Sequence, residues 1–132
     1  MKFSTKSSYG LRAIIHLAKN YGKNPLSLAK ISRIERISLA YLERLFSQLK
    51  KANLVVSSKG ITGGYQLAKS PAKITVFEII QALEGQISVF RCVGTNSKIF
   101  CGIKTCPSVK VYQKVQKALV KSLKSMTLKD LI

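Results

Sequence analysis

The stretch ISLAYLERLFSQLKKANLVVSSKGITGGYQLAKSP, residues 37–71, decides the fold of this chain. In its first part, apolar residues recur every three or four positions: Leu42, Leu45, Phe46 and Leu49. This spacing predicts an amphipathic helix with Ser38 as its N-cap. Its second part holds two short runs of strand-forming residues, 54–56 and 65–68, joined by a glycine-bearing connection. The stretch therefore predicts a helix followed directly by a β-hairpin.

Two more helices are predicted before this stretch. The first places apolar residues on one face and ends before Gly22: Leu11, Ile14, Ile15, Ala18 and Tyr21. The second begins at Ser27 as its N-cap and turns three apolar residues inward: Leu28, Ile31 and Ile34. Its pattern breaks at 35–37, immediately before the helix that Ser38 caps. Two short helices separated by a tight turn predict a helix-turn-helix unit.

Two helices are also predicted after the hairpin. Thr75 and Glu78 have the spacing of a capping box that opens a helix over 76–83. A longer helix begins at about Ser108 and carries a narrow apolar stripe: Val109, Tyr112, Val115, Leu119, Leu123 and Met126. Lysines surround this stripe, so the helix needs a partner, either the core of the same chain or a second copy. A further capping box over 127–130 predicts a short terminal turn of helix.

The element order predicts a mainly α protein with a small β-hairpin wing (α+β). It is the plan of a winged helix-turn-helix with a long C-terminal dimerisation helix. Residues 1–70 form the expected DNA-binding region, and residues 71–132 carry a cysteine-bearing loop and the long helix. At 132 residues we expect both regions to share one compact domain.

The charge of the chain favours a polyanionic partner. The formal net charge is +18, and such self-repulsion is tolerated most readily when nucleic acid neutralises it. A generally lysine-rich proteome is the alternative explanation. The first twenty residues lack the continuous apolar segment of a signal peptide, and no run approaches the length of a membrane span. We therefore expect a cytoplasmic protein without membrane contact.

All three cysteines lie within the segment RCVGTNSKIFCGIKTCPSV, residues 91–109, at Cys92, Cys101 and Cys106. In a reducing compartment, clustered cysteines bind metal or sense redox state more readily than they form a disulfide framework. Cys106 precedes a helix start, where the helix dipole favours a thiolate. From the residues alone an iron-sulfur cluster, a zinc ion and unliganded thiols remain equal alternatives.

The third helix is the expected reader in the major groove of duplex DNA. We expect its side chains Tyr41, Arg44 and Gln48 to be exposed, so that they can contact base edges or phosphates. Lys50, Lys51 and Lys59 can anchor the DNA backbone. The glycines of the hairpin permit positive backbone torsions and close approach to the minor groove. They do not form a nucleotide-binding P-loop, because no Gly-Lys-Ser/Thr ends the run.

Three segments of the chain resemble those of a known protein family. The stretch 37–71, the segment ITVFEIIQALEG at 74–85, and the RC pair at 91–92 followed by two further cysteines resemble the Rrf-two family of winged-helix regulators. The resemblance is strongest to its iron-sulfur members IscR and NsrR. It implies a homodimeric transcription factor, expected to be a repressor, on a palindromic operator. It also implies an iron-sulfur cluster, expected to be 2Fe-2S, held by the three cysteines.

The resemblance also assigns positions to the DNA interface. Glu43 is similar to a glutamate that helps to choose between operator classes, and a carboxylate can accept from cytosine N4. Residues 59–65 match the wing that enters the minor groove, where Lys59 stands in place of a frequent arginine. The resulting DNA-binding set is Ser38, Tyr41, Glu43, Arg44, Gln48, Lys50, Lys51, Lys59, Gly60, Gly63, Gly64 and Tyr65.

The fourth cluster ligand does not carry over from these relatives. The histidine that follows the last cysteine in IscR corresponds to Val109, and the N-terminal aspartate of NsrR corresponds to Ser8. His16 lies among apolar residues of the first helix, so we expect it to be packed or exposed rather than a ligand. One iron is then left open to an exogenous ligand, or is bound weakly by the Ser8 hydroxyl.

Two other classes of function remain. A regulator of the same family can work without a cluster, under control of a partner protein or of thiol redox state. A thiol enzyme or a zinc-dependent RNA-binding protein has less support. No acid or base forms a motif with the cysteines, and one short hairpin offers no aromatic platform for RNA. We therefore expect the chain not to be an enzyme.

Overall fold

The computed structural model describes residues 2–93 and 106–132. The first half holds three helices and a hairpin: α1 (Thr5–Lys19), α2 (Leu28–Glu35), α3 (Leu39–Lys51), β1 (Val55–Ser58) and β2 (Gly64–Leu67). The second half holds two helices and two short 3-10 turns: η1 (Pro71–Lys73), α4 (Val76–Glu84), α5 (Val109–Lys124) and η2 (Leu128–Leu131). This order confirms the predicted winged-helix plan.

Local capping interactions set the helix-turn-helix. The Ser27 hydroxyl accepts from the Lys30 N–H at 3.2 Å, and the Ser38 hydroxyl accepts from the Tyr41 N–H at 3.3 Å. Between the two helices, Arg36 adopts a left-handed backbone conformation with φ 56°, which ends α2. The chain then places Ile37 in the core before α3 begins. Both predicted serine caps are confirmed.

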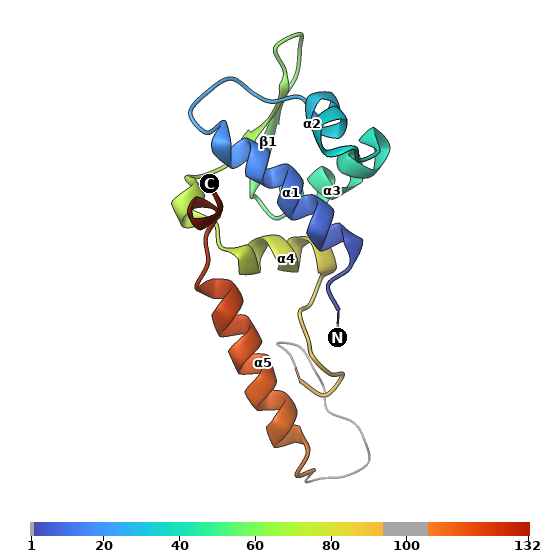
Figure 1. Cartoon of the computed structure of the whole chain (residues 1–132), viewed down its shortest axis with the longest axis vertical. Helices are drawn as coiled ribbons and strands as arrows, with labels where there is room; N and C mark the ends of the chain where they lie inside the picture. Colours follow the sequence, from blue (N-terminus) through green and yellow to red (C-terminus); the bar gives the residue numbers. More distant parts are fainter. Residues whose placement is uncertain (1, 94–105) are drawn as a thin grey trace.

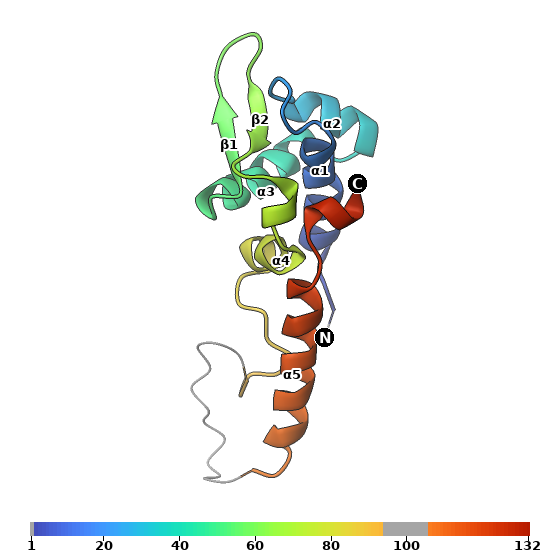
Figure 2. The same ribbon diagram turned by 90° about the vertical axis from the view of Figure 1, so that its left-hand side faces the viewer.

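The wing is a two-stranded antiparallel hairpin in which Val55 pairs with Leu67 and Ser58 with Gly64. Figures 1 and 2 show it extending beyond the helices at one end of the molecule. Its second strand is also bridged to the segment before α2. Leu26 and Tyr65 exchange two backbone hydrogen bonds of 3.0 and 2.9 Å.

The main core joins the first four helices to the base of the hairpin. Its completely buried side chains include Ile14, Ile31, Leu42 and Phe46. The C-terminal turn returns to this core, because the Leu128 N–H donates to the Ile74 carbonyl at 2.9 Å and the Leu128 side chain is completely buried. The end of the chain therefore packs on helices formed by its first half.

Two predicted core positions are wrong. Tyr21 is 50% exposed, because α1 ends at Lys19 and the chain has already left the helix. Ile34 is 54% exposed on the outer face of α2. The short helix buries Leu28 and Ile31, and Ile37 beyond the left-handed Arg36 fills the next core position instead.

Helix α5 extends away from the body at the end opposite the wing (Figures 1 and 2). A small second core of Val76, Ile80, Ile87 and Leu123 joins it to α4. Farther along α5, Val111 and Val115 are 60% and 50% exposed. Within residues 2–93 and 106–132, none of the helices combines the length and the hydropathy that a membrane crossing requires.

Candidate nucleic-acid interface and cysteine segment

Helix α3 presents a charged outer surface. Glu43, Arg44, Lys50 and Lys51 are exposed, while the opposite face buries the core residues of the helix. Ser38 is exposed at the N-terminal end, where it caps the helix. These side chains are accessible to a large partner, and three of the five are cations.

Two side chains of α3 that were expected to be exposed are half-buried. Tyr41 packs edge-on against Tyr9 of α1, with ring centroids 5.9 Å apart and planes at 89°. Gln48 has a buried Oε1 that accepts no hydrogen bond from the residues that the structure describes. The helical pattern placed both off the apolar stripe, but α1 and the base of the wing cover more of α3 than the stripe alone.

The wing carries the predicted DNA-contact residues Lys59 and Gly60 exposed at its tip, whereas Gly63, Gly64 and Tyr65 are half-buried. A Cβ at Gly63 would lie 2.5 Å from the Ser58 carbonyl oxygen, and one at Gly64 would lie 2.4 Å from the Leu26 carbonyl oxygen. Such contacts are far closer than van der Waals distance. Close packing within the protein therefore explains why positions 63 and 64 are glycine, independently of any contact with DNA.

The wing is attached to α3 by side-chain contacts. The Lys50 ammonium donates to the Ser57 hydroxyl at 2.7 Å. The half-buried Tyr65 ring meets Phe46 edge-on at 5.1 Å between centroids. Because both contacts join α3 to opposite strands of the hairpin, the helix and the wing have a defined relative position.

A charged cluster between α1 and α2 was not foreseen. Glu35 accepts from Arg12 at 2.8 Å and is hydrogen-bonded to His16 Nε2 at 2.6 Å. The His16 hydrogen bond is the largest influence on the pKa of Glu35 and, with Arg12, holds it below its usual value against the effect of burial. His16 was expected to be packed or exposed, and Glu35 was not predicted as its partner. Arg12 and His16 are four residues apart on one helix face, which was the available signal.

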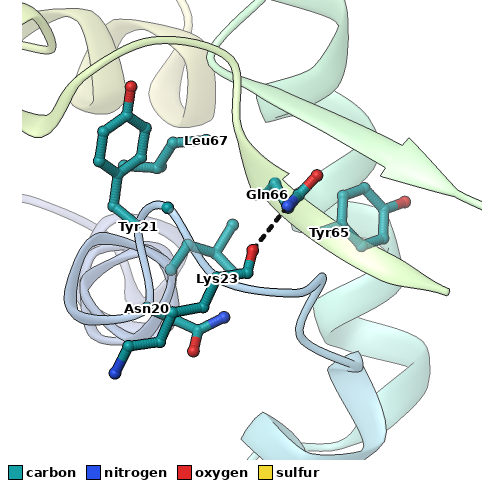
Figure 3. Close-up of a pocket in the computed structure, with 8 residues that line it drawn as sticks. Asn20, Tyr21, Lys23, Tyr65, Gln66 and Leu67 are labelled. Atoms are coloured by element: carbon teal, nitrogen blue, oxygen red, sulfur yellow. Dashed lines mark hydrogen bonds between the residues drawn. The ribbon is translucent and has the colours of Figure 1, made fainter. Parts of the chain in front are cut away.

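A hollow lies at the root of the wing, between the end of α1 and β2 (Figure 3). Leu17 and Leu67 form its apolar side, and Asn20 and Gln66 contribute amides. The Gln66 amide is already engaged, because it donates to the Lys23 carbonyl at 2.8 Å. No motif in the sequence predicts this hollow.

The cysteine segment is described in part. Cys92 and Cys106 are both half-buried and unpaired, and the predicted ligand Cys101 lies outside the described residues. Within the described ranges no group of three metal-binding side chains is assembled. The proposed three-thiol set is therefore not tested by this structure.

Cys106 has the environment of a stabilised thiolate. Its Sγ lies 2.9 Å from the Ser108 Oγ, and this hydrogen bond lowers the pKa of the Cys106 thiol. The residue also lies two positions before Ser108, the N-cap of α5, near a helix N-terminus that favours negative charge. A thiolate at this position fits iron or zinc coordination as well as oxidation chemistry.

Side-chain contacts hold the residues just before the cysteine-bearing segment against α5. The Gln116 amide donates to the Ile87 carbonyl at 2.8 Å and accepts from the Val89 N–H at 2.9 Å. The Phe90 ring stacks on Tyr112 at 4.5 Å between centroids. These contacts fix the chain just before Cys92 relative to the long helix.

The two positions that correspond to the relatives' fourth cluster ligand, Val109 and Ser8, are poorly suited to bind iron. Val109 is half-buried in the first turn of α5 and has no donor atom, and Ser8 is exposed on α1. Beside it, Ser7 is buried and donates to Glu84 at the end of α4. Burial acts to raise the pKa of Glu84, but the hydrogen bonds from Ser4 and Ser7 outweigh it and hold the pKa below its usual value.

Known transcriptional regulators resemble this chain over 67% to 100% of its length. It is 49% identical to the transcriptional regulator CymR of Bacillus subtilis over 88 residues, which span 67% of this chain and 64% of CymR. It is 35% identical to the transcriptional regulator IscR of Cronobacter sakazakii over 133 residues, spanning 100% of this chain and 80% of IscR. The chain thus spans less than two thirds of the Bacillus relative.

The fold agrees with a solved structure. The structure described as CymR, the global cysteine regulator of B. subtilis, superposes with a TM-score of 0.82 at 38% identity, covering 99% of this chain and 95% of that one. These relatives are named as regulators and not as enzymes. A family model described as an iron-dependent transcriptional regulator matches residues 3–132. The chain therefore belongs to the Rrf2 (Rrf-two) family of transcriptional regulators.

Proposed function

We propose that this chain is a DNA-binding transcriptional repressor that works in the cytoplasm as a homodimer on a palindromic operator. The observation that supports this most is the exposed cationic surface of α3 together with the wing that is fixed to it. A formal charge of +18 supplies the long-range attraction to the phosphate backbone.

In this proposal residues 1–70 form the DNA-binding region. Helix α3 lies in the major groove, where Arg44 and Glu43 read base edges and Tyr41 and Gln48 present only their exposed parts. Ser38, Lys50 and Lys51 contact phosphates, and Lys59 with the backbone of the wing meets the minor groove. Gly60, Gly63, Gly64 and Tyr65 shape that backbone.

Residues 71–132 form the sensing and dimerisation region. The exposed Val111 and Val115 on α5 would meet the same helix of a second copy, because this face has no apolar cover among the described residues of one chain. A two-fold dimer places the two α3 helices about 34 Å apart, one turn of DNA. A footprint without two-fold symmetry would contradict the dimer.

Within this region, Cys92, Cys101 and Cys106 hold an iron-sulfur cluster, which we propose to be 2Fe-2S. Thiolates are the usual ligands of such clusters, and the lowered pKa of Cys106 suits that role. The bound cluster would supply sensitivity to iron, oxidants or small ligands. The chain's own contribution is to hold the thiolates and to connect them, through Gln116 and α4, to the reading surface.

The test is an absorption spectrum of anaerobically purified protein with iron and sulfide counted per chain. We expect visible charge-transfer bands that disappear when all three cysteines are changed to alanine. DNA selected from a randomised duplex library by the wild type should then bind the triple variant with changed affinity. An unchanged spectrum in the triple variant would refute the cluster.

A second candidate is a cluster-free regulator of the same family that responds to thiol oxidation or to a partner protein. The likeness to the cysteine regulator CymR and the lowered pKa of the Cys106 thiol favour it. This candidate predicts iron-free protein whose DNA affinity changes with peroxide and is restored by dithiothreitol. Both candidates share the DNA-binding surface and differ in iron content.

A further inference from the structure

We infer that Ile61, at the tip of the wing, enters the minor groove as an apolar wedge and makes the wing selective for base steps that unstack easily. This inference rests on the proposed DNA-binding function. It adds a specificity-determining residue that acts through the shape and deformability of DNA rather than through hydrogen bonds to bases.

Ile61 is the most exposed large hydrophobic residue of the described chain, and its side chain is completely accessible to water. A single exposed isoleucine on an ordinary surface would need no explanation. Here it lies midway in the connection between β1 and β2, and this hairpin extends beyond the helices (Figures 1 and 2). Its neighbours Lys59 and Thr62 are exposed and polar, and no apolar side chain among the described residues covers it.

The turn that carries Ile61 is built to hold one shape. The Gly63 N–H donates to the Gly60 carbonyl at 3.0 Å, which places Ile61 and Thr62 at the two corners of a β-turn. Gly60 has φ +105°, a conformation that favours glycine, and Gly63 has no room for a Cβ. A β-branched side chain on such a turn has few rotamers, so little conformational entropy is lost when it inserts.

The base of the wing transmits this geometry to α3. The Lys50–Ser57 hydrogen bond and the Phe46–Tyr65 ring contact join the hairpin to the helix. When α3 lies in the major groove, the tip is therefore presented at one fixed position along the neighbouring minor groove. Lys59, two residues before Ile61, adds positive charge that a narrow minor groove attracts.

The physical basis of selectivity is a near balance of two terms. Removing the Ile61 side chain from water is favourable, and separating two stacked base pairs is unfavourable by a similar amount. Insertion of the Ile61 side chain is therefore favourable only at base steps whose stacking is weak. Pyrimidine–purine steps such as TA and CA are the easiest to open, so the wedge should favour these steps beside each half-site.

The test uses the whole 132-residue chain and the duplex that it selects from a randomised library. 2-Aminopurine is placed at successive positions beneath the wing, because its fluorescence rises when a base loses its stacking partners. We expect the wild type to raise the fluorescence at one step, and Ile61→Thr to abolish the rise and weaken binding about tenfold, while binding to a scrambled duplex is unchanged. Ile61→Met should retain the rise, because it keeps an apolar side chain.

Val56→Thr is the matched control, since Val56 is an exposed β-branched residue on the wing away from its tip. It should leave both fluorescence and affinity unchanged. The wedge is overturned if the wild type binds its selected duplex without a fluorescence rise, or if Ile61→Thr behaves like the wild type. Neither of these results would contradict the proposed DNA-binding function. A chain that selects no duplex at all would instead overturn the proposed function, and the wedge with it.

Discussion

Gly64 of the wing lies so close to Leu26 that a Cβ on residue 64 would be 2.4 Å from the Leu26 carbonyl oxygen. The contact is between backbones, so no side chain can move to relieve it. We predict that Gly64→Ala destabilises the fold by about 1–3 kcal/mol and separates β2 from the segment before α2. Denaturant unfolding measures the first effect, and amide exchange at Tyr65, which donates to Leu26, reports the second.

Gly60→Ala is the comparison for this prediction. Residue 60 also has a positive φ, but a Cβ there would meet no atom within 4 Å. Its loss of stability should be about 1 kcal/mol, from backbone strain alone, and the Leu26–Tyr65 pairing should stay protected. Equal losses for the two variants, with equal exchange at Tyr65, would contradict the close approach.

The Glu84 carboxylate joins the start of α1 to the end of α4. It accepts from the Ser4 N–H at 2.8 Å and from the Ser7 hydroxyl at 2.5 Å. Since these bonds hold the pKa of Glu84 below its unfolded value, they stabilise the fold above about pH 4.3, and the stabilisation is lost as the pH falls through the folded pKa. We predict that Glu84→Gln lowers the free energy of unfolding by about 1 kcal/mol at pH 7.

The difference between wild type and Glu84→Gln should disappear once the pH falls below the folded pKa of Glu84, because both side chains are then neutral. Glu43→Gln removes the same charge from an exposed site on α3 and should change stability by less than about 0.5 kcal/mol. Unfolding curves at a series of pH values test both statements. A pH-independent loss in Glu84→Gln would mean that the carboxylate contributes through shape and not through charge.

Arg44 is exposed on α3, and we predict that it neutralises a phosphate or reads a base edge. A phosphate contact requires that Arg44→Gln weaken binding to all duplexes and reduce the slope of log K against log salt by about 1. A base contact instead weakens only the selected duplex. Lys110→Gln, an exposed cation at the start of α5, should leave the slope unchanged. Fluorescence anisotropy over a salt series separates these outcomes.

Local chemistry explains which features could be predicted from the sequence. The serine caps of α2 and α3, the Thr75–Glu78 capping box and the hairpin glycines act over a few residues, so their patterns are visible in the chain. The burial of Leu128 and the hydrogen bond from Ser7 to Glu84 join residues that are far apart in sequence. No periodicity encodes such pairs.

The same distinction holds for the candidate site. Exposed cations on α3 follow from helical spacing, whereas the half-burial of Tyr41 depends on Tyr9 of another helix. The role of Gly64 was also ambiguous, because glycine suits both a phosphate contact and a close backbone approach. The close backbone approach is evident only from the position of Leu26 beside Gly64 in the structure, which the sequence does not reveal.

The Gln116 side chain offers a way to loosen the cysteine segment without touching a thiol. Its amide pairs with both the Ile87 carbonyl and the Val89 N–H, and methionine has a similar size but can pair with neither. We predict that Gln116→Met raises amide exchange at Val89 about tenfold, which corresponds to about 1.4 kcal/mol of local stability. If the cysteines hold a cluster, its anaerobic lifetime should shorten in the same variant.

Gln113→Met is the matched control, because Gln113 is exposed on the same helix. It should leave both the exchange at Val89 and the cluster lifetime unchanged. A faster exchange with an unaltered cluster would mean that Gln116 orders the chain before Cys92 without supporting the thiol site. The connection from the cysteines to α4 would then have to run through the Phe90–Tyr112 stack, which Tyr112→Leu would interrupt.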